Sequence, residues 1–167
     1  KSYRTLEFSF IQDYIKNYCF SEMAKKRIDQ IQPFQDIDDL KLYQDDISSA
    51  MKIIYAYGRI PLAPYEDIKE ILQKAQKGGV CYPQDLLKIV QILKNVQEVQ
   101  AYLDQEIEQS HLLEILSILY LPKDLYNEIL KCVDPSGNIY DHASHELYRL
   151  RRQISAIEAN MRKKIEA

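Results

Sequence analysis

The chain has 167 residues, of which 46% are hydrophobic and 28% charged. This is enough apolar material for a buried core, and it excludes a disordered polymer. The formal net charge of -3 at pH 7 argues against a dedicated nucleic-acid-binding domain, whose surface is normally strongly basic. With only 4 Gly and 6 Pro, the chain has few turn residues for a sandwich or barrel of many short strands, so an all-α fold is expected.

Neither the cysteines nor the apolar runs point to secretion or to a membrane. Cys19, Cys81 and Cys132 are odd in number and far apart, which suits neither a disulfide framework nor a zinc site. The longest apolar run, residues 112–121, is interrupted by polar residues and is shorter than the roughly 18 residues of a membrane span. We therefore expect reduced thiols in a cytoplasmic protein with no membrane partner.

The sequence up to Gly58 predicts three helices, the second and third of which begin at polar caps. Ser21 and Asp36 stand directly before helical patterns, where their side chains can accept hydrogen bonds from the free amides of the first turn. Gly58 is placed to end the third of these helices. The first helix is predicted from apolar residues at three- and four-residue steps, namely Leu6, Phe10, Ile11, Tyr14, Ile15 and Tyr18.

The third helix carries a heptad-like apolar stripe. Its members are Leu40, Tyr43, Ile47, Ala50, Ile54 and Tyr57. In a globular chain such a stripe usually faces the interior of its own domain, so we expect it to form core. The alternative is a surface that binds a partner helix.

Prolines and glycines divide the middle of the chain. Pro61 and Pro64 make residues 58–65 a predicted loop, because proline lacks a backbone donor and disfavours helix at the residue before it. A short helix is expected to end at Gly78, and Pro83 suits the first turn of the long helix that follows.

Two shorter helices, at 110–121 and 123–133, are expected before a segment of turn residues begins. Residues 134–137 read Asp-Pro-Ser-Gly and match a type I turn, so a very short β-hairpin is allowed near 133–141. A final helix over 144–167 would be roughly 35 Å long at 1.5 Å per residue. Such a helix is too long for a small domain and is expected to project from it.

The final helix carries an apolar stripe of its own. Its members are Leu147, Leu150, Ile154, Ile157, Met161 and Ile165. We expect Leu147, Leu150 and Ile154 to pack on the core, because packing supplies most of the stability of a helix in water. Met161 and Ile165 are expected to remain exposed or to be buried against a second copy of the chain.

Asp141, His142, His145 and Glu146 form the densest group of potential metal ligands in the sequence. A spacing of three residues can bring two histidines together at a helix start. However, Ser144 or Asp141 is needed to cap that helix, and a carboxylate is favoured at its positive end in any case. Capping is therefore the favoured interpretation, with a metal site as the alternative.

Other chemical interpretations are weaker. His111 follows Ser110 directly, but adjacency does not make a catalytic triad, and the pair stands at a predicted helix start. The 13 tyrosines could stack on bases, yet without interleaved Arg and Lys they are expected as core and edge residues.

Basic residues are concentrated on the final helix. The candidate nucleic-acid contacts are Arg149, Arg151, Arg152, Arg162, Lys163 and Lys164. This positive excess could meet phosphates, with an affinity that falls as salt rises. The alternative is a solvated helix face whose cations complement the helix dipole near a carboxyl end.

The order of short motifs resembles that of the N-terminal region of the bacterial MutS-two proteins. The motifs are Leu6-Glu7-Phe8, residues 21–25, Gln32-Pro33, Gly78-Gly79-Val80, Asp85-Leu86-Leu87 and the run 134–152. That family has an Asp-x-x-Gly-x-(apolar)-x-Asp-x-Ala-Ser run before a long, Arg-rich helix. This chain has Gly137, Ile139, Asp141, Ala143 and Ser144 at the matching places, whereas His142 stands where the family usually has Ser.

The resemblance covers essentially the whole chain and implies a multihelical MutS-core-like domain over residues 1–143. Residues 144–167 would then begin the lever helix that leads to a clamp. It also implies a homodimeric parent with an ATPase that binds ATP and Mg²⁺, usually followed by an Smr endonuclease domain. Such proteins are associated with DNA repair, suppression of recombination and rescue of stalled ribosomes.

Two functions from different classes follow. The first is a non-catalytic core and lever module of a parent that binds DNA or a ribosome; no catalytic, cofactor-binding or metal-binding residue is then expected in this chain. The alternative is a stand-alone helical adaptor that binds another protein. Because the sequence begins at Lys1 and its last helix has no stop signal before Ala167, we expect a piece of a larger protein.

Overall fold

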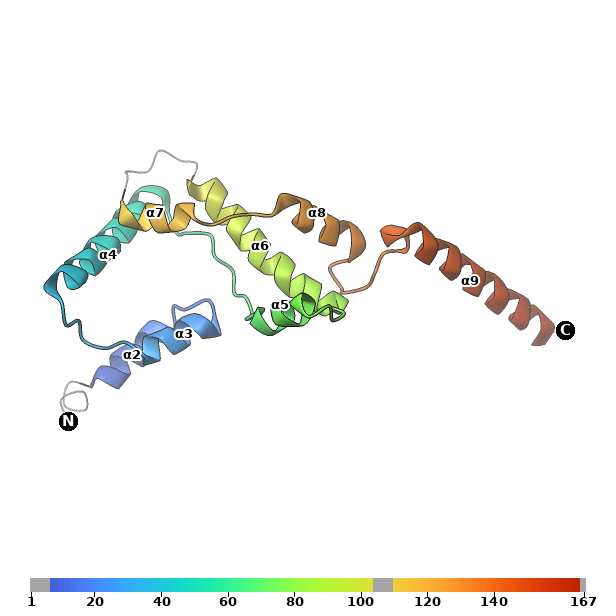
Figure 1. Cartoon of the computed structure of the whole chain (residues 1–167), viewed down its shortest axis with the longest axis horizontal. Helices are drawn as coiled ribbons and strands as arrows, with labels where there is room; N and C mark the ends of the chain where they lie inside the picture. The colour runs from blue at the N-terminus through green and yellow to red at the C-terminus, as the bar shows by residue number, and fades with distance from the viewer. Residues whose placement is uncertain (1–6, 104–109, 166–167) are drawn as a thin grey trace. The chain divides into compact units, whose positions relative to one another are not determined.

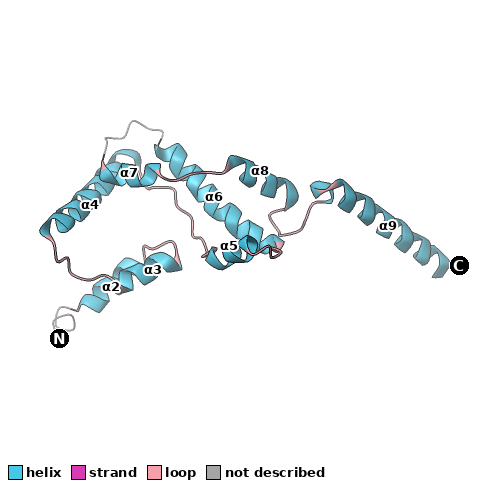
Figure 2. Ribbon diagram, in the orientation of Figure 1, coloured by secondary structure: helices cyan, strands magenta, loops and turns pink. Residues whose placement is uncertain are grey.

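The structure, a computed structural model, describes residues 7–103 and 110–165. Leu6, predicted on the first helix, lies outside this part. The described residues form eight α-helices and one 3₁₀ turn (Figures 1 and 2): α2 Phe8–Lys16, α3 Glu22–Asp29, α4 Ile37–Tyr57, α5 Lys69–Gln76, α6 Pro83–Leu103, α7 His111–Ser117, α8 Lys123–Cys132, η1 Asp141–Ala143 and α9 His145–Ile165. In the described ranges, the only strand-like pairing is an isolated bridge between Val133 and Ile139. The predicted all-α class is confirmed.

The chain divides into two compact units. The first comprises Lys1–Glu70 and Gln91–Leu121, and the second comprises Ile71–Val90 and Pro122–Ala167. The predicted division between a core ending at residue 143 and a lever beginning at residue 144 stays a prediction. Among the described residues, no helix combines the length and hydropathy that a bilayer crossing requires.

The predicted helix caps in the first unit are confirmed. Ser21 Oγ accepts a hydrogen bond from the Ala24 amide at 3.1 Å, and Asp36 Oδ1 accepts one from the Asp38 amide at 2.7 Å. Gly58 follows α4 with a φ of 83°, a left-handed conformation that glycine adopts without steric cost. These contacts satisfy amides that the helix itself leaves free.

Helices α2 and α3 pack as a pair within the first unit. The Gln12 side chain donates to the Ile28 carbonyl at 2.8 Å, and Lys16 forms ion pairs with Asp13 and Asp29. The hydrogen bond to Asp29, the largest cause, raises the pKa of Lys16. Polar contacts thus hold this pair, while the apolar face of α2 is turned to solvent: Phe10 is 70% exposed.

The loop after α4 is fastened to α6 by two buried polar side chains. Asn95, which is 5% exposed, accepts a hydrogen bond from the Ala63 amide at 3.2 Å and donates one to the Ala63 carbonyl at 2.9 Å. Tyr102 Oη donates to the Gly58 carbonyl at 2.7 Å. An extended segment cannot satisfy its own backbone groups, so these side chains replace a neighbouring strand.

The core of the first unit is smaller than the sequence predicts. Ile53 on α4 is buried, together with Leu93 and Val99 on α6. The predicted stripe of α4 is not: Tyr43, for example, is 53% exposed. The expectation that this stripe forms core is therefore wrong for its larger members, because the surface of α4 that packs inward passes through Ile53 instead.

The apolar stripe of the final helix also packs less than predicted. Leu147 is half-buried, but Leu150 and Ile154 are exposed, so the expectation that they pack on the core is wrong. Met161 and Ile165 are exposed, as predicted. The predicted start after Ser144 is confirmed, since Ser144 Oγ accepts from the Leu147 amide at 3.1 Å.

In the second unit, the end of α5 and the start of α6 are joined by a tight capping turn. Gly78 has a φ of 76°, its amide donates to the Ala75 carbonyl, and the Gly79 amide donates to the Lys74 carbonyl, each at 2.9 Å. This is the Schellman pattern, which satisfies the last carbonyls of a helix. A Cβ on Gly79 would meet that carbonyl oxygen at 2.9 Å, so the turn requires glycine there.

We predict that Asn95→Ala lowers the free energy of unfolding of the chain by about 1 to 3 kcal/mol, because the partly buried amide and carbonyl of Ala63 would lose their partners. Urea denaturation followed by circular dichroism measures this. Gln97→Ala, an exposed change on the same helix, is the matched control. Equal stability of the two variants would contradict the assigned role of Asn95.

Candidate nucleic-acid interface

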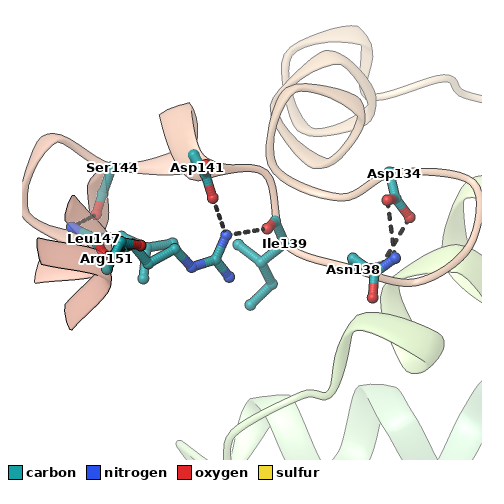
Figure 3. Close-up of polar contacts among 8 residues, drawn as sticks. Asp134, Asn138, Ile139, Asp141, Ser144, Leu147 and Arg151 are labelled. Atoms are coloured by element: carbon teal, nitrogen blue, oxygen red, sulfur yellow. Dashed lines mark hydrogen bonds and ion pairs between the residues drawn. The ribbon is translucent and has the colours of Figure 1, made fainter. Parts of the chain in front are cut away.

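The segment between α8 and α9 is an ordered turn built around Asp134 (Figure 3). The Gly137 amide donates to the Asp134 carbonyl at 3.0 Å, which confirms the predicted turn. The Asp134 carboxylate accepts from the amides of Ser136 and Asn138 and from the Asn138 side chain, at 2.8 to 3.0 Å. The hydrogen bond from the Asn138 amide is the main cause of the lowered pKa of Asp134.

The backbone conformation at the end of this turn favours glycine at position 137. Its φ is 83°, a region that side chains with a Cβ rarely adopt. A Cβ there would also lie 3.1 Å from Nε2 of Gln84, in the first turn of α6. Immediately beyond it, the Tyr140 amide donates to the Cys132 carbonyl at 2.9 Å and closes the short hairpin that the sequence allowed.

Arg151 reaches back from α9 to this connection (Figure 3). Its Nη1 donates to the Ile139 carbonyl at 2.9 Å and forms an ion pair with Asp141 Oδ1. Arg151 was predicted as a candidate nucleic-acid contact, but in this structure its guanidinium is engaged within the chain. No sequence pattern predicts this pairing, because a separation of ten residues across a turn has no fixed geometry.

The other five predicted basic contacts are exposed on α9. At about 100° per residue, Arg149, Arg152 and Lys163 fall within an arc of roughly 60°, whereas Arg162 and Lys164 lie on opposite flanks. The arc is opposite the exposed apolar stripe of α9. The Arg152 guanidinium also lies over the Tyr148 ring, 5.7 Å from its centroid. We call Arg149, Arg152 and Lys163 the basic face of α9.

The four predicted metal-ligand candidates have other roles or lie apart. Asp141 pairs with Arg151, and the His142 ring stacks on Tyr140 with centroids 4.9 Å apart. Across the described residues, no group of three His, Cys, Asp or Glu side chains is placed to hold a metal ion. The predicted cap of α9 is supplied by Ser144 and not by Asp141.

Ser110 and His111 also have structural roles. Ser110 Oγ accepts from the Leu113 amide at 3.4 Å and caps α7. His111 Nδ1 lies 3.0 Å from both carboxylate oxygens of Asp46, joining α7 to α4. The serine hydroxyl thus serves the helix end and the histidine faces a carboxylate on another helix.

Known proteins share sequence with this chain over its whole length. No protein-family model matches it. It is 31% identical over 170 residues to a protein named Endonuclease MutS2 from Clostridium botulinum (strain Alaska E43 / Type E3), covering 100% of this chain and 22% of that protein. The protein of the same name from Halothermothrix orenii is 31% identical over 175 residues, and that from Halalkalibacterium halodurans is 29% identical over 168. The chain thus spans about a fifth of the length of these relatives.

The capped helices, the ordered turn and the long amphipathic α9 define an all-α module, and the similarity extends through all of it. The chain is similar over its whole length to the N-terminal part of proteins named Endonuclease MutS2, which is the resemblance that its motifs predicted.

We predict that the turn around Asp134 is lost in acid. Because the pKa of Asp134 in the folded chain lies below its ordinary value of 3.8, the unfolded chain takes up the proton first as pH falls. The stabilisation is therefore complete above about pH 5 and disappears as pH falls through the lowered pKa. The chemical shift of the Asn138 side-chain amide, followed by NMR as pH is lowered, should report the loss of the turn. Asp134→Asn should abolish this pH-dependent change. A carboxyl titration at its ordinary value would contradict the lowered pKa.

Proposed function

We propose that the chain is a non-catalytic core and lever-start module of a MutS2-type ATPase. The observation that carries the proposal is the similarity to MutS2 proteins over the full length of the chain, which includes the turn and the start of α9. The named relatives are endonucleases, yet the chain spans only about a fifth of their length, so the activity of a parent protein is part of the proposal.

In this role the chain transmits motion and does no chemistry. A helix of 21 residues such as α9 is about 32 Å long and moves as a stiff element. Another part of a homodimeric parent would bind ATP and Mg²⁺, and a clamp beyond α9 would embrace DNA or a ribosome. The cellular role would be DNA repair with suppression of recombination, or rescue of stalled ribosomes, in the cytoplasm.

We predict that the purified chain neither hydrolyses ATP nor cuts DNA. It has no glycine-rich phosphate loop followed by Lys and Ser or Thr, and Ser110 and His111 serve α7. Phosphate release and plasmid nicking are the measurements. Turnover that survives purification and is lost in variants of this chain would overturn the proposal.

The parent gene provides a separate test. A G-x-x-x-x-G-K-[ST] segment in the same reading frame, well beyond this region, would support an ATPase parent. A reading frame restricted to this chain would instead favour the adaptor.

The stand-alone adaptor remains the second candidate because apolar side chains are exposed on more than one helix. Phe10 and Tyr14 are exposed on α2, Tyr18 is exposed just beyond its end, and Tyr43 and Ile47 are exposed on α4. Exposed aromatic side chains at helical spacing suit docking of another helix. The same faces in a longer parent would be available to other parts of that chain.

The basic face of α9 is proposed to contact nucleic-acid phosphates in the parent. Its three cations share one side of the helix, so a single backbone could meet all of them. The net charge of -3 gives the chain little long-range attraction for DNA, so this contact is expected to be weak on its own.

We predict that the chain binds duplex DNA weakly and without sequence preference, and that replacing Arg149, Arg152 and Lys163 with Ala weakens this binding further. The logarithm of the binding constant falls linearly with the logarithm of the salt concentration, and each lost phosphate contact lowers the steepness of this line by about 0.9. Loss of three contacts should therefore lower it by about 2.7. Fluorescence anisotropy at several salt concentrations measures both the affinity for DNA and its dependence on salt.

The control replaces Lys77, Lys123 and Lys131, which are exposed and lie off α9, and changes the net charge equally. Salt-resistant, sub-micromolar binding, or equal loss in both variants, would show that the basic face of α9 is not the binding surface.

A further inference from the structure

We propose that Arg151 is a positioning residue that sets the direction of α9 relative to the connection before it, within the second unit. Its guanidinium joins the second turn of α9 to the connection before it, through the Ile139 carbonyl and the Asp141 carboxylate. We call this set of contacts the Arg151 latch. It gives Arg151 a role distinct from that of the basic face of α9.

The latch spans the point at which the helical conformation is interrupted between η1 and α9. Ser144 separates η1 from α9 with φ -148° and ψ 150°, an extended conformation that interrupts any helix through this point. Rotation at one extended residue swings everything after it, so the direction of α9 requires a side-chain contact across the break. Arg151 makes such a contact, and η1 is the element against which α9 packs in this unit.

The residues on the rest of α9 give little alternative support. Leu147 is half-buried, whereas Leu150, Ile154, Ile157 and Met161 are exposed. An apolar interface therefore secures only the beginning of the helix. The Ser144 cap stabilises the first turn but leaves its orientation open, because the cap hydrogen bond moves with the helix.

The chemistry of the contact suits orientation better than stability. Ion pairs between exposed side chains contribute little to the free energy of unfolding, and both partners here are largely accessible. A planar guanidinium, however, has donors in fixed directions, and a carbonyl and a carboxylate together fix its position. Small energies are sufficient to choose between directions of a helix that has few other contacts.

The identity of Asp141 fits the same role. Its carboxylate lies in η1, one residue beyond Tyr140, whose amide bonds to α8 through the Cys132 carbonyl. The acceptor atoms are thus anchored to α8 by the short hairpin, and the donor is carried by α9. The latch connects two helices through a connection that is itself ordered.

Residual dipolar couplings of backbone amides in the intact 167-residue chain test this. In the unmodified chain, one alignment tensor should fit α8 and the first half of α9. In Arg151→Gln, one tensor should no longer fit both helices, and the magnitude of the alignment tensor of α9 should fall. Secondary chemical shifts should show that α9 is still helical. Asp141→Asn, which is nearly isosteric, should have the same effect and serves if Arg151→Gln fails to fold.

Arg152→Gln is the matched control, because it removes the same charge one residue further along and should leave the shared tensor unchanged. Raising the salt concentration should make the alignment tensor of α9 in the unmodified chain approach that of Arg151→Gln. It should not change the tensor of that variant further. The Arg151→Gln/Asp141→Asn double variant should be no more mobile than either single variant. A shared tensor retained in Arg151→Gln, an equal loss in Arg152→Gln, or additive effects in the double variant would each overturn the latch.

Discussion

Free backbone groups at helix ends and in extended connections are the constraint on which this structure depends. A chain of short helices has many such ends, and each needs a partner. Polar side chains supply these partners. In the connections, Ser21, Asp36, Ser110 and Ser144 accept hydrogen bonds from helix amides. On α6, Asn95 bonds to both the amide and the carbonyl of Ala63. The arrangement of helices within each unit follows from where those polar residues stand.

These local features are also what the sequence predicts well. Capping uses one side chain and amides two or three residues away, so the residue type and its position are sufficient to identify it. The turn at Asp134 and the end of α4 at Gly58 were predicted for the same reason. The family was predicted from the run that contains this turn, because several of its residues are fixed by the turn and the cap.

Long-range packing could not be read in the same way. A stripe such as Tyr43, Ile47 and Ile54 identifies an apolar helix face, but periodicity does not say what covers it. The structure buries Ile53 instead, beside α6 residues that the pattern does not relate to it. Of the candidate site, the sequence identified the basic helix but not the pairing of Arg151 with Asp141, since a contact across a turn depends on the path of the backbone.

The turn between α5 and α6 has a consequence for how the chain folds. The Asp85 carboxylate accepts from the Tyr82 amide, and Lys74 Nζ lies 4.4 Å from the centroid of the Tyr82 ring. Together with the glycine turn, all of these contacts join residues only a few positions apart. Closing such a short loop loses little chain entropy, and contacts of low sequence separation form rapidly. The turn between α5 and α6 can therefore form early and locally, before distant segments meet, whereas the contact between Asn95 and Ala63 must wait for a loop of some thirty residues to close.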